Sequence, residues 1–346
     1  MNSTEAQELI ATLPEPVTDI LQPGRRVVVT GCAGFIGSHL AEALLALGCR
    51  VVGVDSLTDY YDPVLKRENL AGCLAHDHFT FHEQDLLELD AVELLTGATA
   101  CFHLAAQAGV RASWGSYFTE YLARNVQTTQ QLLEACLADP VRQDLRRFVY
   151  SSSSSVYGDA RELPVTEQAL PAPRSPYGVT KLAGEHLCVL YSANFGVPTS
   201  SLRYFTVYGP RQRPDMAFRK FIERALAGET FRVYGDGSQT RDFTFVTDAA
   251  RANLLAVAPA TTCEVFNVGG GERISLREAL DMLQRLLADQ SPGKAPGLEY
   301  DDMAKGDVRD TFANRSHVED VIGYRPLVPF ADGLAREVTW ALARRQ

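Results

Sequence analysis

The chain has 346 residues, more than a single hydrophobic core usually serves, so we expect two lobes. Hydrophobic residues make up 46% of the chain and charged residues 22%, an ordinary globular composition that argues against intrinsic disorder. The 33 basic and 43 acidic side chains give a net charge of -10 without a long basic run, which argues against a nucleic-acid-binding protein.

Residues 1–24 are polar and interrupted by prolines, and we expect them to form an extension outside the main fold. They carry acids where a secretory signal has a basic start, and no stretch of the chain is long and apolar enough to span a bilayer. The cysteines are scattered, odd in number and without CxxC spacing. We therefore expect a cytoplasmic protein with reduced thiols, without a disulfide framework or a metal site, at Cys32, Cys49, Cys73, Cys101, Cys136, Cys188 and Cys263.

From Arg25 onward, continuous apolar runs alternate with helical stretches. Such runs are typical of strands that are covered on both faces. The predicted strands are Arg26–Thr30, Arg50–Val54, Thr80–His82, Ala100–Leu104, Arg147–Tyr150, Pro198–Tyr204 and Val265–Val268. The predicted helices include Ile36–Leu47, Asn125–Leu137 and Tyr177–Phe195. This alternation predicts an α/β protein with a doubly wound parallel sheet of the Rossmann type.

After Tyr204 the alternation breaks down, and two later helices, near 275–288 and 330–344, are separate from the sheet pattern. We predict a smaller, interleaved C-terminal lobe that binds the substrate, with the chain returning to the sheet in between. The expected limits are 1–24 for the extension, 25–203 plus 240–268 for the nucleotide-binding domain, and 204–239 plus 269–346 for the smaller lobe.

A glycine-rich turn joins the first predicted strand to the first helix. Gly31 allows a tight turn, Gly34 lets a pyrophosphate approach the backbone, and Gly37 lets the helix pack against the strand. The helix N-terminus offers free N–H groups to phosphates. Asp55 ends the next strand, where a carboxylate accepts hydrogen bonds from ribose hydroxyls and repels a 2′-phosphate. No Arg or Lys follows at Ser56 or Leu57, so the pattern favours NAD over NADP.

Two further strand ends are candidates for cofactor contacts. Asp85 and Leu86 follow one strand and are candidates for the adenine edge, although a surface acid is nearly as good an interpretation. Small residues follow another strand after His103, which suits a backbone that passes close to a ligand. We expect His103 itself to be a hydrogen-bonded core residue and not a catalyst.

Tyr177 and Lys181 lie four residues apart on a predicted helix and hence on one face of it. An ammonium beside a phenol lowers the pKa of the tyrosine and makes it a usable general base. The run Ser151–Ser155 ends the preceding strand at the edge of the sheet where doubly wound folds bind ligands. A serine hydroxyl there would bridge the tyrosine and a substrate hydroxyl.

The segments TGCAGFIGSHL, HLAAQAGVR, RNVQTTQQLLEA, FVYSSSSSVYG and SPYGVTKLAGE together resemble the extended short-chain dehydrogenase/reductase family. The resemblance runs from about Arg25 to the C-terminus. It implies that Ser153 joins Tyr177 and Lys181 as the catalytic residues, and that Asn125 maintains the helix geometry or a proton-relay water. It also implies NAD contacts from Gly31, Gly34, Phe35, Ile36, Gly37, Asp55, Asp85, Leu86, Leu104, Ala105, Ala106, Asn125, Tyr177 and Lys181.

Two serines indicate which chemistry the family resemblance implies. Dehydratases of this family carry an Asp-Glu pair just after the catalytic hydroxyl, and sugar-acid decarboxylases carry a Glu two positions after it. Ser154 and Ser155 occupy these positions here. Elimination needs an acid and a base on adjacent carbons, so the sequence favours plain epimerisation.

Later segments of the chain, RYFTVYGPRQRPDMAF, FRVYGDGSQTRDFTFV and GDVRD, resemble the UDP-sugar-binding segments of the family. Arginine forks suit phosphate oxygens, so Arg241 and Arg309 would contact the diphosphate, with Tyr234 beside the uracil. For each arginine alone, a surface ion pair is an equally good interpretation. The resemblance implies substrate contacts from Gln107, Arg111, Ser153, Ser154, Thr206, Arg213, Tyr234, Arg241 and Arg309.

Thr206 and Arg213, with SLTDYYDPVLK after Asp55, resemble the UDP-glucuronate 4-epimerases of this family. We therefore expect a homodimeric enzyme that interconverts UDP-glucuronate and UDP-galacturonate through a 4-keto intermediate, with hydride passed to NAD+ and back. Arg213, Thr206 and the serines near Ser153 would hold the sugar carboxylate and so oppose loss of CO2. The alternatives are a UDP-glucose or UDP-N-acetylglucosamine 4-epimerase, a UDP-glucuronate decarboxylase, disfavoured by Ser155, and a non-catalytic NAD-binding regulator, disfavoured by the Tyr–Lys pair.

Overall fold

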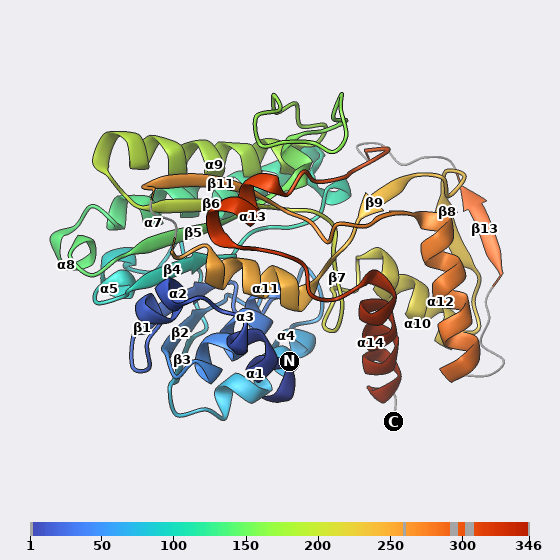
Figure 1. The fold of residues 1–346 in the computed structure, drawn as a ribbon, viewed down its shortest axis with the longest axis horizontal. Coiled ribbons are helices and arrows are strands. Elements are labelled where there is room, and N and C mark those ends of the chain that lie inside the picture. Colours follow the sequence, from blue (N-terminus) through green and yellow to red (C-terminus); the bar gives the residue numbers. More distant parts are fainter. Residues whose placement is uncertain (1–2, 259–260, 291–296, 302–307, 345–346) are drawn as a thin grey trace.

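A seven-stranded parallel sheet forms the centre of the computed structural model, which describes residues 3–258, 261–290, 297–301 and 308–344 (Figure 1). Its strand order is β11-β6-β5-β4-β1-β2-β3, and β1 and β4 lie at the point where the chain direction across the sheet reverses. The strands are β1 (Arg26–Thr30), β2 (Arg50–Val54), β3 (Phe79–His82), β4 (Ala100–His103), β5 (Arg147–Ser153), β6 (Thr199–Tyr204) and β11 (Cys263–Val268). This order confirms the predicted doubly wound Rossmann sheet, which places ligands at the carboxyl end of the strands.

Helices cover both faces of the sheet because its strands are apolar on both sides. Buried side chains of β1 and β2 pack on one face against helices that share a single core, α3 (Phe35–Ala46), α4 (Pro63–Leu74) and α11 (Val246–Leu255). The other face packs against α5 (Ala91–Leu95), α7 (Thr128–Ala135) and α9 (Pro176–Phe195). Between β4 and α7 the chain forms short 3-10 turns at Arg111–Ser113 and Gly115–Tyr117, the helix α6 (Phe118–Tyr121) and a π-helical segment at Leu122–Gln127. Helix α8 (Asp139–Arg142) precedes β5, and a 3-10 turn at Ser154–Val156 follows β5.

The N-terminal residues contradict one expectation. Helix α1 (Ser3–Ala11) packs onto α3, α2 (Glu15–Ile20) follows it, and Leu9, Val17 and Leu21 are buried in the same core as the sheet. Arg251 of α11 also donates from Nε to Thr12 Oγ1 at 2.7 Å. The expectation that residues 1–24 lie outside the main fold is therefore wrong for the described residues 3–24, because their apolar side chains join the core that contains α3.

A second group of elements extends from the carboxyl end of the sheet and lies to the right in Figure 1. It contains α10 (Ala217–Ala227), α12 (Leu276–Gln290), α14 (Phe330–Ala343) and the parallel pair β8 (Phe231–Tyr234) and β13 (Leu298–Asp301). Two small ribbons and a helix connect it to the sheet. The ribbons are β7 (Val207–Tyr208) with β10 (Thr244–Phe245) and β9 (Thr240–Asp242) with β12 (Arg273–Ser275), and the helix is α13 (Ser316–Ile322). The chain returns to the sheet through α11 and β11, and the exact limits between the lobes stay a prediction.

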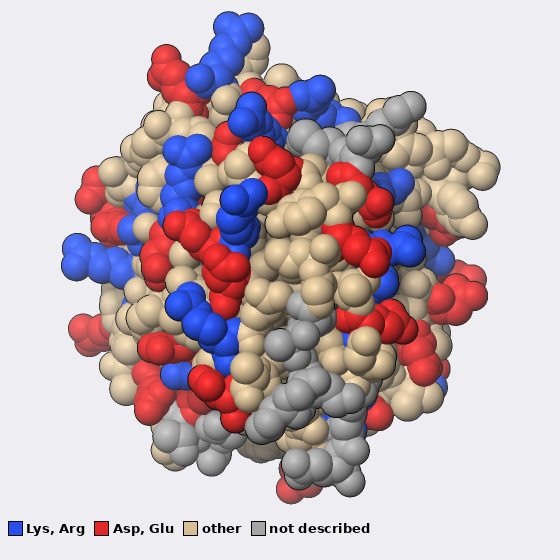
Figure 2. Space-filling view, turned by 90° about the vertical axis from the view of Figure 1, so that its right-hand side faces the viewer, with Lys and Arg blue, Asp and Glu red and all other residues tan. Residues whose placement is uncertain are grey.

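The surface of this second group carries mixed charge. Figure 2 shows basic and acidic side chains interspersed over the face that it presents, without a broad patch of either sign. No helix among the described residues is long and apolar enough to cross a membrane. Within the same residues, His, Cys, Asp and Glu side chains form no cluster that would hold a metal ion.

Candidate active site

The glycine-rich turn after β1 lines a cavity at the carboxyl end of the sheet. Gly31 has a φ of +69°, and a Cβ at this position would come within 2.7 Å of the Ala105 nitrogen. A Cβ at Gly37 would lie 2.1 Å from the Gly31 carbonyl oxygen, so only glycine lets α3 start this close to the strand. A Cβ at Gly34 would meet only the same carbonyl, at 3.1 Å. The turn is therefore a backbone cradle next to a helix N-terminus, which suits a diphosphate.

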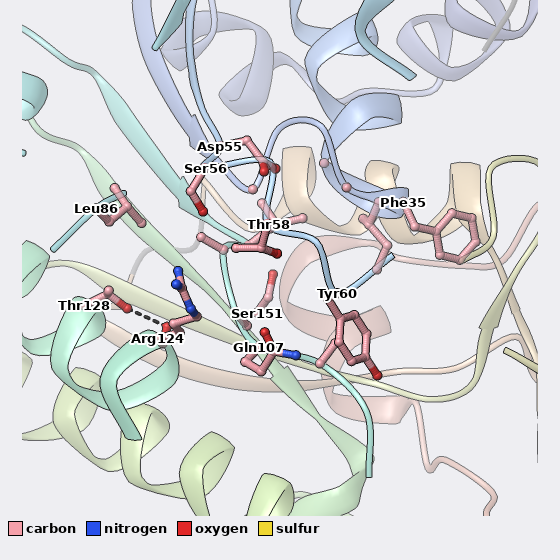
Figure 3. Close-up of a pocket in the computed structure, with 18 of the residues that line it drawn as sticks. Phe35, Asp55, Ser56, Thr58, Tyr60, Leu86, Gln107, Arg124, Thr128 and Ser151 are labelled. Atoms are coloured by element: carbon pink, nitrogen blue, oxygen red, sulfur yellow. Dashed lines mark hydrogen bonds between the residues drawn. The ribbon is translucent and has the colours of Figure 1, made fainter. Parts of the chain in front are cut away.

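Asp55 fixes the shape of this turn from the end of β2. Its Oδ2 accepts a hydrogen bond from the Ala33 N–H at 3.1 Å, and its Oδ1 accepts one from the Leu57 N–H at 2.9 Å. Burial raises the pKa of Asp55, while these hydrogen bonds and the charge of Lys66 oppose the rise. In Figure 3, Asp55 and Ser56 lie on one side of the cavity, across from Arg124. This position fits the predicted contact with ribose hydroxyls.

Lys66, the last residue of the segment SLTDYYDPVLK, lines the cavity but was not among the predicted contacts. It lies on α4, and its Nζ donates to the Thr58 carbonyl oxygen at 2.8 Å and to Thr58 Oγ1 at 3.0 Å, with the ring of Tyr61 4.8 Å away. Burial lowers the pKa of Lys66, and the charge of Asp55 opposes this. Lys66 thus ties the loop after β2 to α4. Lys66 and Asp55 lie on different elements, so no local sequence pattern predicted that the two side chains interact.

Arg124, a second cation that was not predicted, pairs with Asp85 on the adenine side of the cavity. Asp85 Oδ2 accepts from Arg124 Nη1 at 2.8 Å, and both side chains line the cavity with Leu86 and Thr128. The small residues after His103 line the same cavity, namely Leu104, Ala105 and Ala106.

Asn125 lies behind this wall and is 1% exposed. Its side chain accepts from the Gln107 N–H at 2.7 Å and donates to the Gln107 carbonyl at 3.0 Å and to Thr180 Oγ1 at 3.0 Å. These bonds hold the loop after β4 against α9. They are consistent with the prediction that Asn125 maintains the geometry of the helix. His103 contacts Thr30 and Thr129 through its two ring nitrogens, and burial lowers its pKa to about 3, so it is a neutral core residue.

The predicted catalytic residues converge at the carboxyl end of β5. Helix α9 begins here because Ser175 Oγ caps it, accepting from the Gly178 N–H at 3.1 Å. Tyr177, on the first turn of α9, shares a hydrogen bond with the Ser153 side chain. One turn further along, Lys181 donates from Nζ to the Ser151 carbonyl oxygen at 2.8 Å. Tyr177, Lys181 and Ser151 line the same cavity as the glycine-rich turn.

Burial dominates the titration of Tyr177 and Lys181. It raises the pKa of Tyr177, and the charge of Arg213 and the hydroxyl of Ser153 oppose this rise. Burial also lowers the pKa of Lys181 to about 7, because its ammonium lies among apolar and backbone groups. The expectation that Lys181 lowers the pKa of Tyr177 stays a prediction.

A buried ion pair behind β5 was also absent from the predictions. Glu185 of α9 pairs with Arg203 of β6, and the two side chains are 4% and 5% exposed. Glu185 Oε2 accepts from Ser152 Oγ at 2.9 Å and from Arg203 Nε at 2.9 Å, and Arg203 Nη1 donates to Tyr157 OH at 2.6 Å. The network joins β5, β6 and α9 directly behind Ser153.

The predicted carboxylate-binding residues line two different cavities. Ser154, Ser155 and Thr206 line a small cavity with Ser175 and Arg241. Arg213 lines the large cavity with Tyr177, and its Nε and Nη2 donate to the two carboxylate oxygens of Asp215 at 2.9 and 3.0 Å. The structure therefore does not bring Arg213 and Thr206 onto one cavity wall.

The predicted nucleotide contacts lie on the second lobe. Arg241 donates to the carbonyl oxygens of Arg309 and Val308 at 2.8 and 2.7 Å, so it holds this segment through its backbone. The Arg309 side chain is 74% exposed and borders a surface cavity beside β8. Arg111 lies over the ring of Tyr234 at 4.4 Å, which brings two predicted substrate residues from the two lobes together. Gln107 lines the large cavity.

Comparison with known proteins places this geometry in context. The model of the NAD dependent epimerase/dehydratase family matches residues 27–269. An uncharacterized UDP-glucose epimerase, YtcB of Bacillus subtilis, is 41% identical over 91% of this chain and 97% of that protein. A UDP-glucuronate 4-epimerase of Thermodesulfobacterium geofontis is 36% identical over 91% of this chain and 95% of that protein.

A solved structure extends the likeness to three dimensions. The crystal structure of UDP-glucuronic acid 4-epimerase from Bacillus cereus, in complex with UDP-glucuronic acid and NAD, superimposes with a TM-score of 0.86 at 41% sequence identity. The match covers 92% of this chain and 99% of that one. The likeness therefore includes the sheet and the second lobe.

Proposed function

The chain belongs to the NAD-dependent epimerase/dehydratase family, and on that premise we propose that it interconverts UDP-glucuronate and UDP-galacturonate by inverting C4 of the sugar. The observation that carries the proposal is the convergence of Ser153, Tyr177 and Lys181 beside the glycine-rich cradle. Ser154 and Ser155 stand where an acid for dehydration or decarboxylation would be needed. The bound UDP-glucuronic acid and NAD of the Bacillus cereus enzyme support the choice of substrate and cofactor.

The cavity fits NAD on its own evidence. Gly31 and Gly37 are positions where a Cβ would collide with the backbone, so the cradle is open to a diphosphate. Asp55 at the end of β2 suits ribose hydroxyls, and Leu86 with Thr128 offers a wall for the adenine. When bound, NAD+ supplies a reversible hydride acceptor for C4 of the sugar.

The protein's own residues supply the proton chemistry. Tyr177 removes the proton from O4 of the sugar while C4 is oxidised, and returns a proton to O4 when C4 is reduced from its other face. Ser153, hydrogen-bonded to Tyr177, orients the phenol and the sugar hydroxyl. Lys181 is fixed by the Ser151 carbonyl and brings its amino group to the same cavity as Tyr177. The second lobe holds UDP, so the sugar can turn about its diphosphate link between the two half-reactions.

We place the binding site of the sugar carboxylate beside this centre. Ser154, Ser155 and Thr206 present hydroxyl groups to one small cavity, and hydroxyls are good donors to a carboxylate. Holding the carboxylate near the ring plane prevents overlap of the breaking C–C bond with the 4-keto group, which opposes loss of CO2. The pairing of Arg213 with Asp215 favours a second candidate, a UDP-glucose 4-epimerase, because Arg213 already has a carboxylate partner in the absence of an acidic sugar.

The test is incubation of the purified protein, without added NAD, with UDP-glucuronate, UDP-glucose or UDP-N-acetylglucosamine in separate reactions. Chromatography of the sugars then gives the rate of each conversion. We expect UDP-galacturonate to form fastest, and the Tyr177→Phe variant to form it about 1000-fold more slowly. Faster conversion of UDP-glucose would support the second candidate, and CO2 as the main product would refute both.

We also propose that the active form is a homodimer in a reducing compartment such as the cytoplasm. Exposed apolar side chains lie on α9, at Val179 and Leu190, and on the neighbouring segment before α7, at Tyr117 and Leu122. Such patches mark association sites. None of the seven cysteines is paired. Light scattering during gel filtration should give twice the chain mass, and Leu190→Asp should give a monomer; a monomeric wild-type protein would refute the proposal.

A further inference from the structure

The small cavity beside the serine run is lined by hydrogen-bond donors and by no acidic side chain among the described residues. Two arginines, Arg174 and Arg241, line it together with five serine or threonine side chains and two valines. Arg213, the arginine predicted to hold the carboxylate, lines the large cavity instead. Guanidinium and hydroxyl donors around one cavity suit an anion, because they replace the water that the charge loses on binding.

Arg174 reaches this cavity from the segment that precedes α9. The Ala172 N–H donates to the Val156 carbonyl oxygen at 3.0 Å, which ties this segment to the turn after β5. In the same turn, a Cβ at Gly158 would lie 3.0 Å from Arg174 Cγ, so the stem of Arg174 packs directly on the turn. The next residue, Ser175, caps α9. Arg174 is therefore held between the turn that follows the serine run and the first turn of α9.

One acid pairs with the Arg174 guanidinium and joins it to the second lobe. Arg174 Nη1 pairs with Asp159 Oδ2, while Asp159 Oδ1 accepts from the Arg309 N–H at 3.2 Å. A guanidinium has five N–H donors, so a contact through Nη1 leaves the Nε and Nη2 donors to other partners. The Arg174 side chain is 56% exposed, so a ligand in the cavity can reach these donors.

Arg241, the other arginine of the cavity, is bound to the backbone. Its Nη1 donates to the carbonyl oxygens of Thr240 and Arg309 at 2.9 and 2.8 Å, and its Nη2 donates to that of Val308 at 2.7 Å. These bonds fix the loop that closes the cavity on the side of the second lobe. Of the two arginines in the described wall, Arg174 is therefore the one that can turn its guanidinium toward a ligand.

We propose that Arg174 is a specificity-determining residue: its guanidinium binds the carboxylate of a uronic acid that the hydroxyls of Ser154, Ser155 and Thr206 also contact. This inference rests on the proposed function, since it deepens the placement of the sugar carboxylate in this cavity. A neutral sugar has a hydroxymethyl group in place of the carboxylate and gains little from a cation. Arg174 therefore discriminates between UDP-glucuronate and UDP-glucose and leaves the binding of the UDP moiety unchanged.

The test is titration calorimetry of the NAD-loaded, full-length protein with UDP-glucuronate, UDP-glucose and UDP. The Tyr177→Phe background slows conversion of the sugar during the titration. Arg174→Gln should raise the Kd of UDP-glucuronate about 10-fold, because a charge-assisted hydrogen bond is lost. The Kd values of UDP-glucose and UDP should stay within about 2-fold. Arg174→Lys retains the charge without the planar fork and should raise the Kd of UDP-glucuronate only about 3-fold.

The matched control is Arg161→Gln, which removes the same charge from an exposed residue three positions after Gly158. It should leave all three Kd values within about 2-fold of the parent. Equal weakening of UDP-glucuronate, UDP-glucose and UDP by Arg174→Gln would mean that Arg174 contacts the diphosphate or only supports the fold, and would overturn the inference.

An unchanged Kd of UDP-glucuronate in Arg174→Gln would overturn the inference as well. So would an Arg174→Lys variant that binds UDP-glucuronate as weakly as Arg174→Gln, because the charge would then have no part in binding. If the wild-type protein converts no UDP-sugar, the proposed function fails, whereas the Kd values still decide the role of Arg174.

Discussion

Replacement of Lys181 by methionine should make the protein inactive and more stable at the same time. Lys181 is 4% exposed, and burial lowers its pKa from an ordinary value of 10.5 to about 7. Below pH 7 the lysine is protonated in the folded and the unfolded chain, so the folded chain carries the whole cost of the buried charge. Between pH 7 and 10.5 only the unfolded chain stays protonated, so folding becomes more favourable as the pH rises.

The size of the effect follows from the two pKa values. Their difference gives a cost of about 5 kcal/mol at pH 6.5, which falls to about 2 kcal/mol at pH 9. Lys181→Met removes this cost, and the gain in the free energy of unfolding should therefore be about 2–3 kcal/mol larger at pH 6.5 than at pH 9. The lost hydrogen bond to the Ser151 carbonyl is worth about 1 kcal/mol at either pH, so it cancels from this difference.

Urea unfolding of the cofactor-free protein, followed by circular dichroism at the two pH values, measures this difference. The matched control is Lys220→Met, which removes the same charge from an exposed position on α10. Lys220→Met should change the free energy of unfolding equally at both pH values. A gain for Lys181→Met that is independent of pH would refute the reasoning, because it would mean that the buried lysine keeps an ordinary pKa.

Three further predictions concern activity and stability. Tyr177→Phe should reduce kcat by about 1000-fold without loss of bound NAD, measured by sugar analysis and by the absorbance of released cofactor. Arg203→Met leaves the Glu185 carboxylate buried without its partner, so the free energy of unfolding in urea should fall by about 3–5 kcal/mol. The double variant Arg203→Met/Glu185→Leu should regain most of this stability. An equal loss in the single and the double variant would contradict the reasoning. Removal of residues 1–21 should lower the melting temperature by at least about 4 °C in scanning fluorimetry, and an unchanged value would show that the N-terminal helices do not stabilise the core.

The parts of the fold that could be predicted are those that a local pattern determines. The runs Arg26–Thr30 and Arg50–Val54 are strands with the predicted limits, since a β-branched run buried on both faces has few alternatives. The region before α7 differs from the prediction. We expected one helix at Asn125–Leu137, but the chain is π-helical at Leu122–Gln127 and α-helical only from Thr128 to Ala135. The Asn125 side chain bonds to Gln107 and Thr180 at this place, and these distant partners left no periodic signal.

The residues of the candidate site also fall into those that a local pattern predicts and those that only tertiary packing places. Tyr177 and Lys181 could be paired from the sequence because one helix fixes their spacing. The contacts of Lys66 and Asp215 could not be predicted, since Lys66 reaches the cavity from α4 and Asp215 accepts from the cavity residue Arg213, and tertiary packing sets both positions. For the same reason the prediction named Arg213 without its counter-ion.

The serine run at the end of β5 shows how one short sequence serves several partners. The Ser151 hydroxyl lies 3.3 Å from Tyr204 OH, Ser152 donates to Glu185, and Ser153 contacts Tyr177 and accepts from the Ser155 N–H at 3.1 Å. These three hydroxyls therefore already bond to protein groups that fix the strand end and the base. Ser154 and Ser155 instead line the small cavity with Thr206. It follows that substitutions at Ser154 and Ser155 should change which sugar is accepted, whereas those at Ser152 and Ser153 should impair every substrate alike.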